Sequence, residues 1–329
     1  MVLIVWSNVL LATDRREIKI VRITEKVKVD GVLDELFWED CYVSGGFSQN
    51  IPNTGAPCSE KTEVRIAYDD NAIYIGATMF DDRDSMSLTL SQRDDEGNAD
   101  WFNVVFDPYN AGTIGFSFLV TSAGVQEDVL EQVNSRDVNW NAVWRSAVEV
   151  HDDRWVAEMR IPFSALRFSS SKLETWGINF GRNIRRHREQ SYWNFYDPQG
   201  LNLLSQLGEL KGLENVNSPL RLFLTPYISG YIQNYNGSTG YTGNGGMDVK
   251  YGINDAFTLD MTLIPDFGQV QFDNKVLNLS PFEVQYNERR QFFTEGTQLL
   301  IKPDYFIRDV LAEDRLITER RTATLILTK

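Results

Sequence analysis

Cysteine and histidine are scarce in this sequence, with two of each among 329 residues. The single cysteine pair, Cys41 and Cys58, could form one disulfide in an exported chain, although sequence alone does not show whether the two residues approach each other. The Cys-x-x-Cys-His motif that attaches haem covalently is absent. Haem ligation would depend on His151 or His187, and His151 lies in a predicted turn where a solvated side chain is expected.

Positive charge is also in short supply. The chain has 46 acidic and 32 basic residues, which gives a formal net charge of −14, and the only concentrated basic segment is residues 182–188. Nucleic-acid binding depends on basic surfaces that contact phosphates. The charge balance therefore excludes DNA and RNA as expected partners.

The apolar run at the N-terminus, residues 2–12, is too short to cross a bilayer as a helix. It resembles the hydrophobic part of a signal peptide, although the basic segment that normally precedes such a run is missing. We interpret residues 1–16 as a signal-peptide remnant or an N-terminal extension of an exported chain. A first strand of the following domain is the alternative.

Helical patterns are few, and short alternating strands separated by turn residues dominate the sequence up to about residue 214. Residues 62–68 and 72–80 predict one antiparallel hairpin, and residues 101–108 and 115–120 predict a second pair. This spacing of strands and turns is typical of a β-sandwich. We predict an all-β, antiparallel sandwich of immunoglobulin-like or jelly-roll-like type over residues 17–214.

The pattern changes in residues 215–329. Strands over residues 221–233, 248–253 and 257–263 alternate between one apolar and one polar face, as the wall of a transmembrane β-barrel does. A soluble curved sheet with one solvated face is the alternative. Roughly four or five such strands fit before the last residue, fewer than the eight of the smallest barrels. We therefore expect a partial barrel in a truncated chain.

One segment near the N-terminus, residues 27–38, combines an alternating strand, an Asp30–Gly31 turn and an amphipathic turn with a tryptophan. Glycine supplies the positive φ that a tight turn needs. The spacing of the apolar residues predicts that Trp38 docks on a sheet, with Asp34 as the expected helix cap.

Several of these segments together resemble the family 9 carbohydrate-binding modules in order and spacing. They are residues 27–38, 61–70, 73–76 and 100–108.

Further segments resemble a bacterial subgroup in which this module precedes an uncharacterised outer-membrane-type β-barrel domain. The likeness extends over about residues 23–296, and beyond it the sequence departs from the subgroup, which normally continues much further. For this chain the resemblance implies the periplasm or outer membrane of a Gram-negative bacterium. The segments are residues 115–126, 155–168, 176–193 and, in the barrel domain, 282–296.

The resemblance implies a sandwich that binds a sugar between aromatic side chains, with polar groups orienting the hydroxyls, in glycan capture or carbohydrate catabolism. Stacking supplies affinity and hydrogen bonds supply orientation. A tryptophan taken singly is more often part of a core than a sugar platform. The candidate contact residues are Trp101, Trp140, Trp144, Arg145, Arg182 and Trp193.

Some members of the resembled family carry calcium, and acidic residues near two turns offer the oxygen ligands that calcium prefers. The sequence shows no ligand loop of fixed spacing, so solvated turns are the other interpretation. We assign no metal ligands. The acidic residues are Asp69, Asp70, Asp81, Asp82 and Asp84.

Modules of this kind are commonly attached to glycoside hydrolases, which need two carboxylates at a set separation. Glu127, Asp128 and Glu131 lie close in sequence, but such a cluster is typical of a solvated face, and no Gly-x-Ser-x-Gly motif is present. We therefore predict a binding module without catalytic residues. An enzyme acting on O-glycosyl bonds and a haem-binding sandwich are the alternatives.

Overall fold

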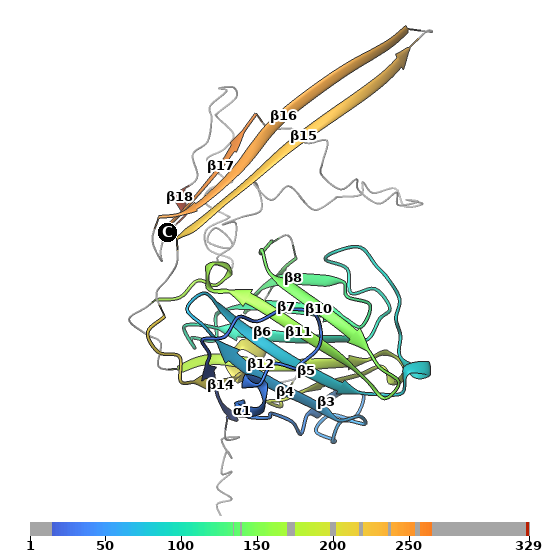
Figure 1. Ribbon diagram of the computed structural model, residues 1–329, viewed down its shortest axis with the longest axis vertical. Coiled ribbons are helices and arrows are strands. Elements are labelled where there is room, and N and C mark those ends of the chain that lie inside the picture. The colour runs from blue at the N-terminus through green and yellow to red at the C-terminus, as the bar shows by residue number, and fades with distance from the viewer. Residues whose placement is uncertain are drawn as a thin grey trace, which may run out of the picture. The chain divides into compact units, whose positions relative to one another are not determined.

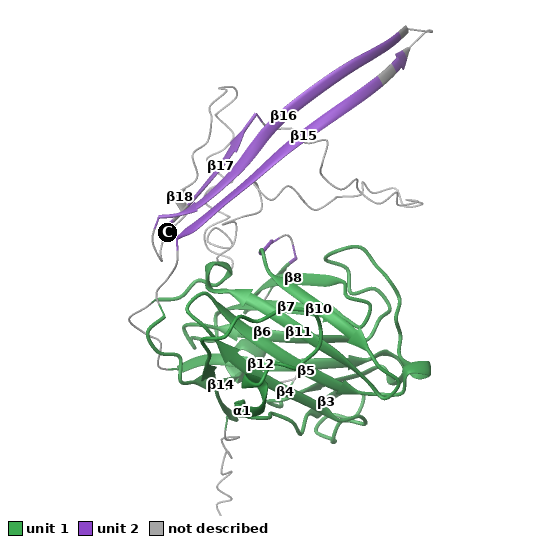
Figure 2. Cartoon of the chain, in the orientation of Figure 1, with its two compact units in different colours: residues 1–137, 143–217 green, residues 138–142, 218–329 purple. Residues whose placement is uncertain are grey.

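The computed structural model describes residues 15–133, 135–138, 140–169, 175–197, 202–216, 220–235, 238–253, 257–264 and 327–328. The chain forms two compact units, residues 1–137 with 143–217 and residues 138–142 with 218–329 (Figure 2). The division near residue 217 lies three residues beyond the boundary expected from the sequence. Most of the expected signal-peptide segment and residues 282–296 lie outside the described residues.

The first unit is a β-sandwich of a nine-stranded and a five-stranded sheet, which lie one over the other (Figure 1). This confirms the predicted all-β sandwich. The nine-stranded sheet has the order β1 (Glu17–Lys19), β14 (Gly208–Lys211), β12 (Thr175–Ile184), β6 (Trp101–Asp107), β7 (Ile114–Thr121), β8 (Gln126–Gln132) and β9 (Arg136–Asp137), with β13 (Glu189–Tyr192) pairing with β12 and β3 (Ser48–Ile51) with β13.

The five-stranded sheet contains the first predicted hairpin, and its pairing confirms that prediction: residues 62–68 pair antiparallel with residues 72–80. The antiparallel prediction is wrong at two edges, because the short N-terminal strands join β14 and β4 in parallel. The order is β10 (Arg145–Val150), β11 (Arg154–Pro162), β5 (Ala72–Phe80), β4 (Thr62–Tyr68) and β2 (Val21–Arg22).

Aromatic and branched side chains from both sheets fill the space between them. Trp176 of β12 lies at the centre of this core, with ring centroids 6.4 Å from Phe106, 6.4 Å from Phe163 and 5.2 Å from Phe168. Phe163 begins a single 3-10 turn, η2 (Phe163–Ala165), which directly follows β11. Three more 3-10 turns connect strands: η1 (Arg83–Ser85), η3 (Arg185–His187) and η4 (Leu203–Gln206).

The segment 27–38 and the helix α1 (Phe37–Asp40) cover the outer face of the five-stranded sheet, as predicted. Trp38 is 2% exposed and packs over Gly76, where an added Cβ would lie 2.7 Å from Leu33. Because the position has no side chain, Trp38 and Leu33 can approach the strand closely. The prediction that Asp34 caps this helix is wrong, because the N-cap residue is Leu36, which makes no side-chain hydrogen bond.

A buried carboxylate fixes the turn in this segment. Glu158 of β11 accepts hydrogen bonds from the backbone N–H groups of Asp30, at 2.9 Å, and Gly31, at 3.1 Å. Gly31 has a φ of +92° and lies against the backbone of β10. Burial, acting against these two hydrogen bonds, raises the pKa of Glu158 to about 7.

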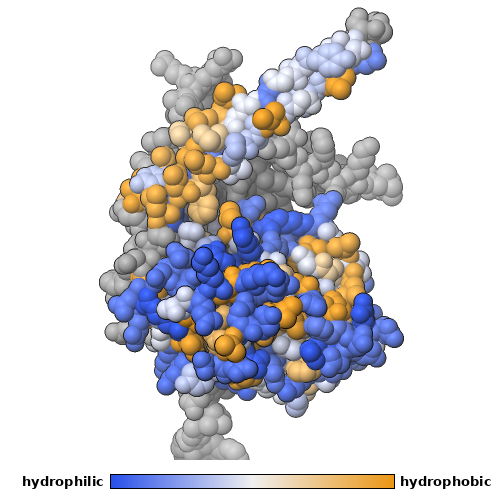
Figure 3. All heavy atoms as spheres, viewed as in Figure 1, coloured by the Kyte–Doolittle hydropathy of each residue, from blue (hydrophilic) through white to orange (hydrophobic). Residues whose placement is uncertain are grey.

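The second unit contains a four-stranded antiparallel sheet, and its first strand has the predicted apolar face. The opposite face of that strand is mixed, with Phe223, Tyr227 and Tyr231 beside the polar residues. Leu222, Leu224, Ile228 and Ile232 are exposed on one face of the first strand. Figure 3 shows hydrophobic side chains gathered where three strands run side by side. The strands, in order, are β15 (Arg221–Tyr235), β16 (Ser238–Gly252), β17 (Thr258–Leu263) and β18 (Leu327–Thr328).

Within the described part of the chain, no helix is long and apolar enough to cross a membrane.

We predict that Glu158 makes stability fall as pH rises. The pKa of Glu158 is about 7 in the folded chain against an ordinary value of 4.5, so the folded state binds the extra proton between these values. The contribution of Glu158 to the free energy of unfolding is fully present below pH 4.5 and is lost as pH rises through 7. In Glu158→Gln, the amide oxygen still accepts from both N–H groups and no longer ionises. Urea unfolding at about pH 5 and about pH 8 should show a smaller stability loss in the variant than in the wild type, by on the order of 2 kcal/mol.

Glu149→Gln on the neighbouring strand is the control and should keep the wild-type pH dependence. An identical pH dependence for Glu158→Gln and the wild type would contradict the prediction.

Candidate functional site

A cleft of about 920 Å³ lies at one edge of the sandwich, where β10 of one sheet is joined to β8 of the other. All of its lining residues belong to the first unit. The lining combines indole, amide, hydroxyl and basic side chains with three valines. It consists of residues 27–29, 91, 93, 124–126, 144–146 and 160.

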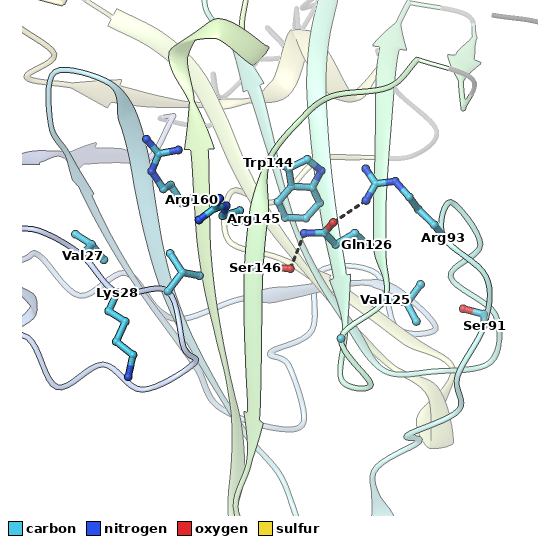
Figure 4. A pocket seen from close by; sticks show the side chains of 12 residues that line it. Val27, Lys28, Ser91, Arg93, Val125, Gln126, Trp144, Arg145, Ser146 and Arg160 are labelled. Atoms are coloured by element: carbon cyan, nitrogen blue, oxygen red, sulfur yellow. Dashed lines mark hydrogen bonds between the residues drawn. The ribbon is translucent and has the colours of Figure 1, made fainter. Parts of the chain in front are cut away.

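The side chain of Gln126 connects the two sheets within the cleft. Its oxygen accepts a hydrogen bond from Arg93 at 2.6 Å, and its nitrogen donates to the hydroxyl of Ser146 at 2.9 Å (Figure 4). Because the oxygen accepts and the nitrogen donates, the two bonds fix the orientation of the amide. The polar groups of the cleft are thus positioned before any ligand arrives.

A fully buried carboxylate, Asp128, lies two residues further along β8, on the same face as Gln126. It accepts a hydrogen bond from the indole N–H of Trp144 at 3.1 Å and forms an ion pair with Arg93. Trp144 also packs edge to face against Phe118, with ring centroids 5.4 Å apart. These contacts hold both Trp144 and Arg93 at the wall of the cleft.

Arg145 and Arg160 occupy directly opposite positions on β10 and β11. Figure 4 shows them on one side of β10, with Gln126 and Trp144 on the other. The guanidinium of Arg160 lies 5.9 Å from the ring centroid of Tyr74 and donates to its hydroxyl at 3.3 Å. A basic wall therefore faces the side of the cleft where residues 27–29 pass.

The sequence-predicted tryptophans are less exposed than sugar stacking requires. Trp101 lies in β6, where every residue is buried, and is 5% exposed. Trp193 is 4% exposed, with its ring 5.6 Å from Phe180 and beneath the guanidinium of Arg16. The candidate role of Trp101 as a sugar contact is therefore corrected, because both faces of its strand are covered.

Of the other candidates, Trp144 and Arg145 are brought together in the cleft. Trp144 is 6% exposed, so only a small part of its ring is available, whereas Arg145 is exposed. Trp140 is half-buried and belongs to the second unit, so its role stays a prediction.

Arg182 was a candidate sugar-contact residue, and the structure corrects this expectation. Its guanidinium is 1% exposed, pairs with Asp81 at 3.2 Å and donates to the backbone oxygens of Lys61 and Phe80 at 2.9 Å and 2.8 Å. Arg182 therefore connects the two sheets inside the sandwich. A sugar cannot reach it in this conformation.

Four of the five aspartates considered for calcium have other roles. Asp69 accepts hydrogen bonds from the backbone of Asn71 and Ala72, Asp82 caps η1, and Asp81 is buried between arginines. Asp70 pairs with Arg22. Among the described residues, no three acidic, histidine or cysteine side chains converge as a metal site.

The carboxylates considered for catalysis are buried, which corrects the expected solvated face. Glu127 and Glu131 both pair with Arg136 on the face of β8 opposite Asp128. Burial raises the pKa of both glutamates, against the attraction of Arg136. The two glutamates therefore form ion pairs within the protein.

The cysteines and histidines lie apart from the cleft lining. Cys41 and Cys58 are free thiols, and burial raises the pKa of Cys41 to about 11. His151 occupies the turn between β10 and β11, and His187 is exposed in η3.

Sequence reasoning missed four polar residues of the cleft: Arg93, Gln126, Ser146 and Arg160. One of them had a usable signal. The turn at residues 151–153 sets the register of the β10–β11 hairpin. Counting the same number of residues away from the turn along both strands places Arg160 opposite Arg145.

Residues 218–309 match a family described as a domain of unknown function (DUF5916), and the match begins where the first unit ends. No curated protein matches the chain.

Solved structures similar to this chain include a family 9 carbohydrate-binding module from Caldicellulosiruptor kristjanssonii. Its glucose complex is 16% identical with a TM-score of 0.45, covering 61% of this chain and 98% of that one. Its cellotriose complex is 18% identical with a TM-score of 0.44, covering 61% and 96%. A candidate carbohydrate-binding protein from Bacteroides uniformis is 14% identical with a TM-score of 0.50, covering 60% and 99%. At this identity, the last likeness establishes a shared fold.

We predict that Asp81→Asn strongly destabilises the chain. It removes the buried negative charge that pairs with Arg182 and Arg186, and the guanidinium of Arg182 is 1% exposed. Breaking a buried ion pair costs about 3 kcal/mol or more. Urea unfolding should show this loss. Asp153→Asn, which removes an exposed pair with Arg154, should cost less than about 1 kcal/mol. Equal effects of the two changes would contradict the structural role of Arg182.

Proposed function

We propose that the sandwich of residues 15–216 is a carbohydrate-binding domain and that the cleft beside β10 holds the sugar. The observation that carries this proposal is the oriented amide of Gln126, held between Arg93 and Ser146 at the cleft wall. A sugar presents hydroxyl groups that both donate and accept hydrogen bonds. Prepositioned amide, hydroxyl and guanidinium groups are suited to such a ligand.

The cleft also offers apolar contacts for the C–H groups of a sugar ring. Val27, Val29 and Val125 line it together with the accessible part of Trp144. A few fixed polar groups among apolar surfaces are typical of small-molecule sites. The fold supports the proposal as well, because the Bacteroides uniformis protein with the same fold is a candidate carbohydrate-binding protein. Fold alone does not fix function, so the argument depends on the cleft.

Binding without hydrolysis fits this cleft better than a glycosidase does. Glycoside hydrolysis needs two carboxylates beside the bond that breaks. The described lining residues include no aspartate or glutamate. For the whole chain, the corresponding role is glycan capture by an exported protein in carbohydrate catabolism.

We predict that Gln126→Leu weakens glycan binding by the full chain about tenfold, because it removes the two hydrogen bonds that organise the cleft. Binding is measured by calorimetry with oligosaccharides selected on a glycan array. Gln132→Leu, at the other end of β8, is the matched control and should bind as the wild type does. A folded wild-type chain that binds no glycan on the array would contradict the proposed function.

We also propose that the sheet of the second unit contacts lipid in the outer membrane. The observation behind it is the exposed apolar face of β15, on which Ile228 is 93% exposed. β15 and β16 have 15 residues each, more than the about 9–11 residues that a strand needs to cross a bilayer. Lipid on the apolar side and water on the polar side would suit both faces.

Flotation of the full chain with phospholipid vesicles tests this second proposal. The wild type should float with the vesicles. Ile228→Lys places a charge on the apolar face and should reduce the floating fraction, because a lysine facing lipid costs about 2–4 kcal/mol near the midplane. Ser229→Lys, on the opposite face, should float as the wild type does. Failure of the wild type to float, or equal loss in both variants, would contradict lipid contact.

A further inference from the structure

Two positive side chains are held side by side in the cleft. Arg145 and Arg160 are directly opposite each other in the β10–β11 pair, so their side chains leave the same face of the sheet. Directly opposite like charges destabilise an antiparallel pair. The arrangement therefore costs stability unless something else neutralises it.

Within the described residues, the structure offers these two arginines no carboxylate partner. The side chain of Arg145 has no hydrogen bond or ion pair there, and the side chain of Arg160 donates only to the hydroxyl of Tyr74. The nearest acidic side chain on the same face of β11, Glu158, is buried and accepts from Asp30 and Gly31 instead. The guanidinium of Arg145 is left for solvent or a ligand, and that of Arg160 reaches a carboxylate only through the Tyr74 hydroxyl, which donates to Asp69 at 3.0 Å.

The rest of the cleft wall has the same sign. Lys28 and Arg93 also line it, and the described lining has no acidic residue, although the whole chain has a formal net charge of −14. Lys28 pairs with Asp30 at 2.7 Å, and Arg93 pairs with Asp128. The uncompensated charge is thus concentrated at Arg145 and Arg160.

We propose that the sugar held in the cleft is anionic and that Arg145 and Arg160 bind its carboxylate or sulfate group. This inference rests on the proposed carbohydrate site and adds the class of ligand. A guanidinium presents paired N–H donors that match the oxygens of a carboxylate or sulfate. An anion between the two arginines also removes their mutual repulsion. A cleft lined by one sign of charge concentrates ligands of the opposite sign.

Calorimetry on the full chain tests the charge of the ligand with three probes: galacturonate hexamer, whose only acidic groups are carboxylates, κ-carrageenan hexasaccharide, whose only acidic groups are sulfate esters, and neutral cellohexaose. At about 50 mM sodium chloride, at least one of the two acidic probes should bind about tenfold or more tightly than cellohexaose. Its affinity should fall as the salt concentration rises, while the affinity for cellohexaose should not change. The two acidic probes distinguish carboxylate from sulfate ester as the group that is bound.

The variants Arg145→Gln and Arg160→Gln test whether the acidic probe binds in the cleft. Each should weaken binding of the preferred acidic probe about tenfold, because each removes a charge-assisted hydrogen bond. Arg145→Gln should not lower the melting temperature, because it relieves a like-charge contact and breaks no side-chain hydrogen bond or ion pair among the described residues. Arg160→Gln, by contrast, also loses the contact with Tyr74. Arg154→Gln is the matched control, since Arg154 lies on the same strand and face but outside the cleft lining. It should bind as the wild type does.

The outcomes separate this inference from the proposed function. Cellohexaose binding as tight as that of both acidic probes would overturn the anionic ligand and leave the carbohydrate site intact. Unchanged acidic-probe binding in the double variant Arg145→Gln/Arg160→Gln would overturn the role of the two arginines. A folded wild-type chain that binds none of the three probes and no glycan on the array would overturn both.

Discussion

The buried guanidinium of Arg182 is the interaction on which the arrangement of the two sheets depends. It extends from β12 of the nine-stranded sheet and bonds to the start of β4 and the end of β5, where it pairs with Asp81. Across its own sheet, Arg182 pairs with Phe102, Phe102 with Val120, and Val120 with Gln126. This row of cross-strand neighbours therefore contains both Arg182, which connects the two sheets, and Gln126, whose amide organises the cleft.

The cleft results from how the free edge of one sheet meets the other. β10 ends the five-stranded sheet, and the bond between Ser146 and Gln126 joins it to β8. On the outer side, residues 27–29 continue into the Asp30–Gly31 turn, whose N–H groups donate to Glu158. The chain then reaches Trp38, which packs over Gly76. The same N-terminal segment thus closes the outer face of the sheet and forms part of the cleft wall.

The sequence was a good guide to strands and a poor guide to which face each strand buries. Alternation and turn residues predicted the 62–80 hairpin and the pair around residues 101–120, because both depend on local patterns. Trp101 and Arg182 were misplaced because burial depends on what covers the second face, and distant segments supply that cover. The cleft around Gln126 was not predictable either, since five segments that are separated in the sequence form it. The opposition of Arg145 and Arg160 was accessible in principle, because hairpin register is set by a local turn.

The central claim is that ligand binding occurs in the cleft and not at the buried tryptophans. Hydrogen–deuterium exchange on the full chain, with and without the tightest-binding oligosaccharide, tests it most directly. The account predicts slower exchange in peptides that contain residues 124–126 and 144–146, with no change around Trp101 and Trp193. Protection around Trp101 or Trp193 with none at the cleft would contradict it.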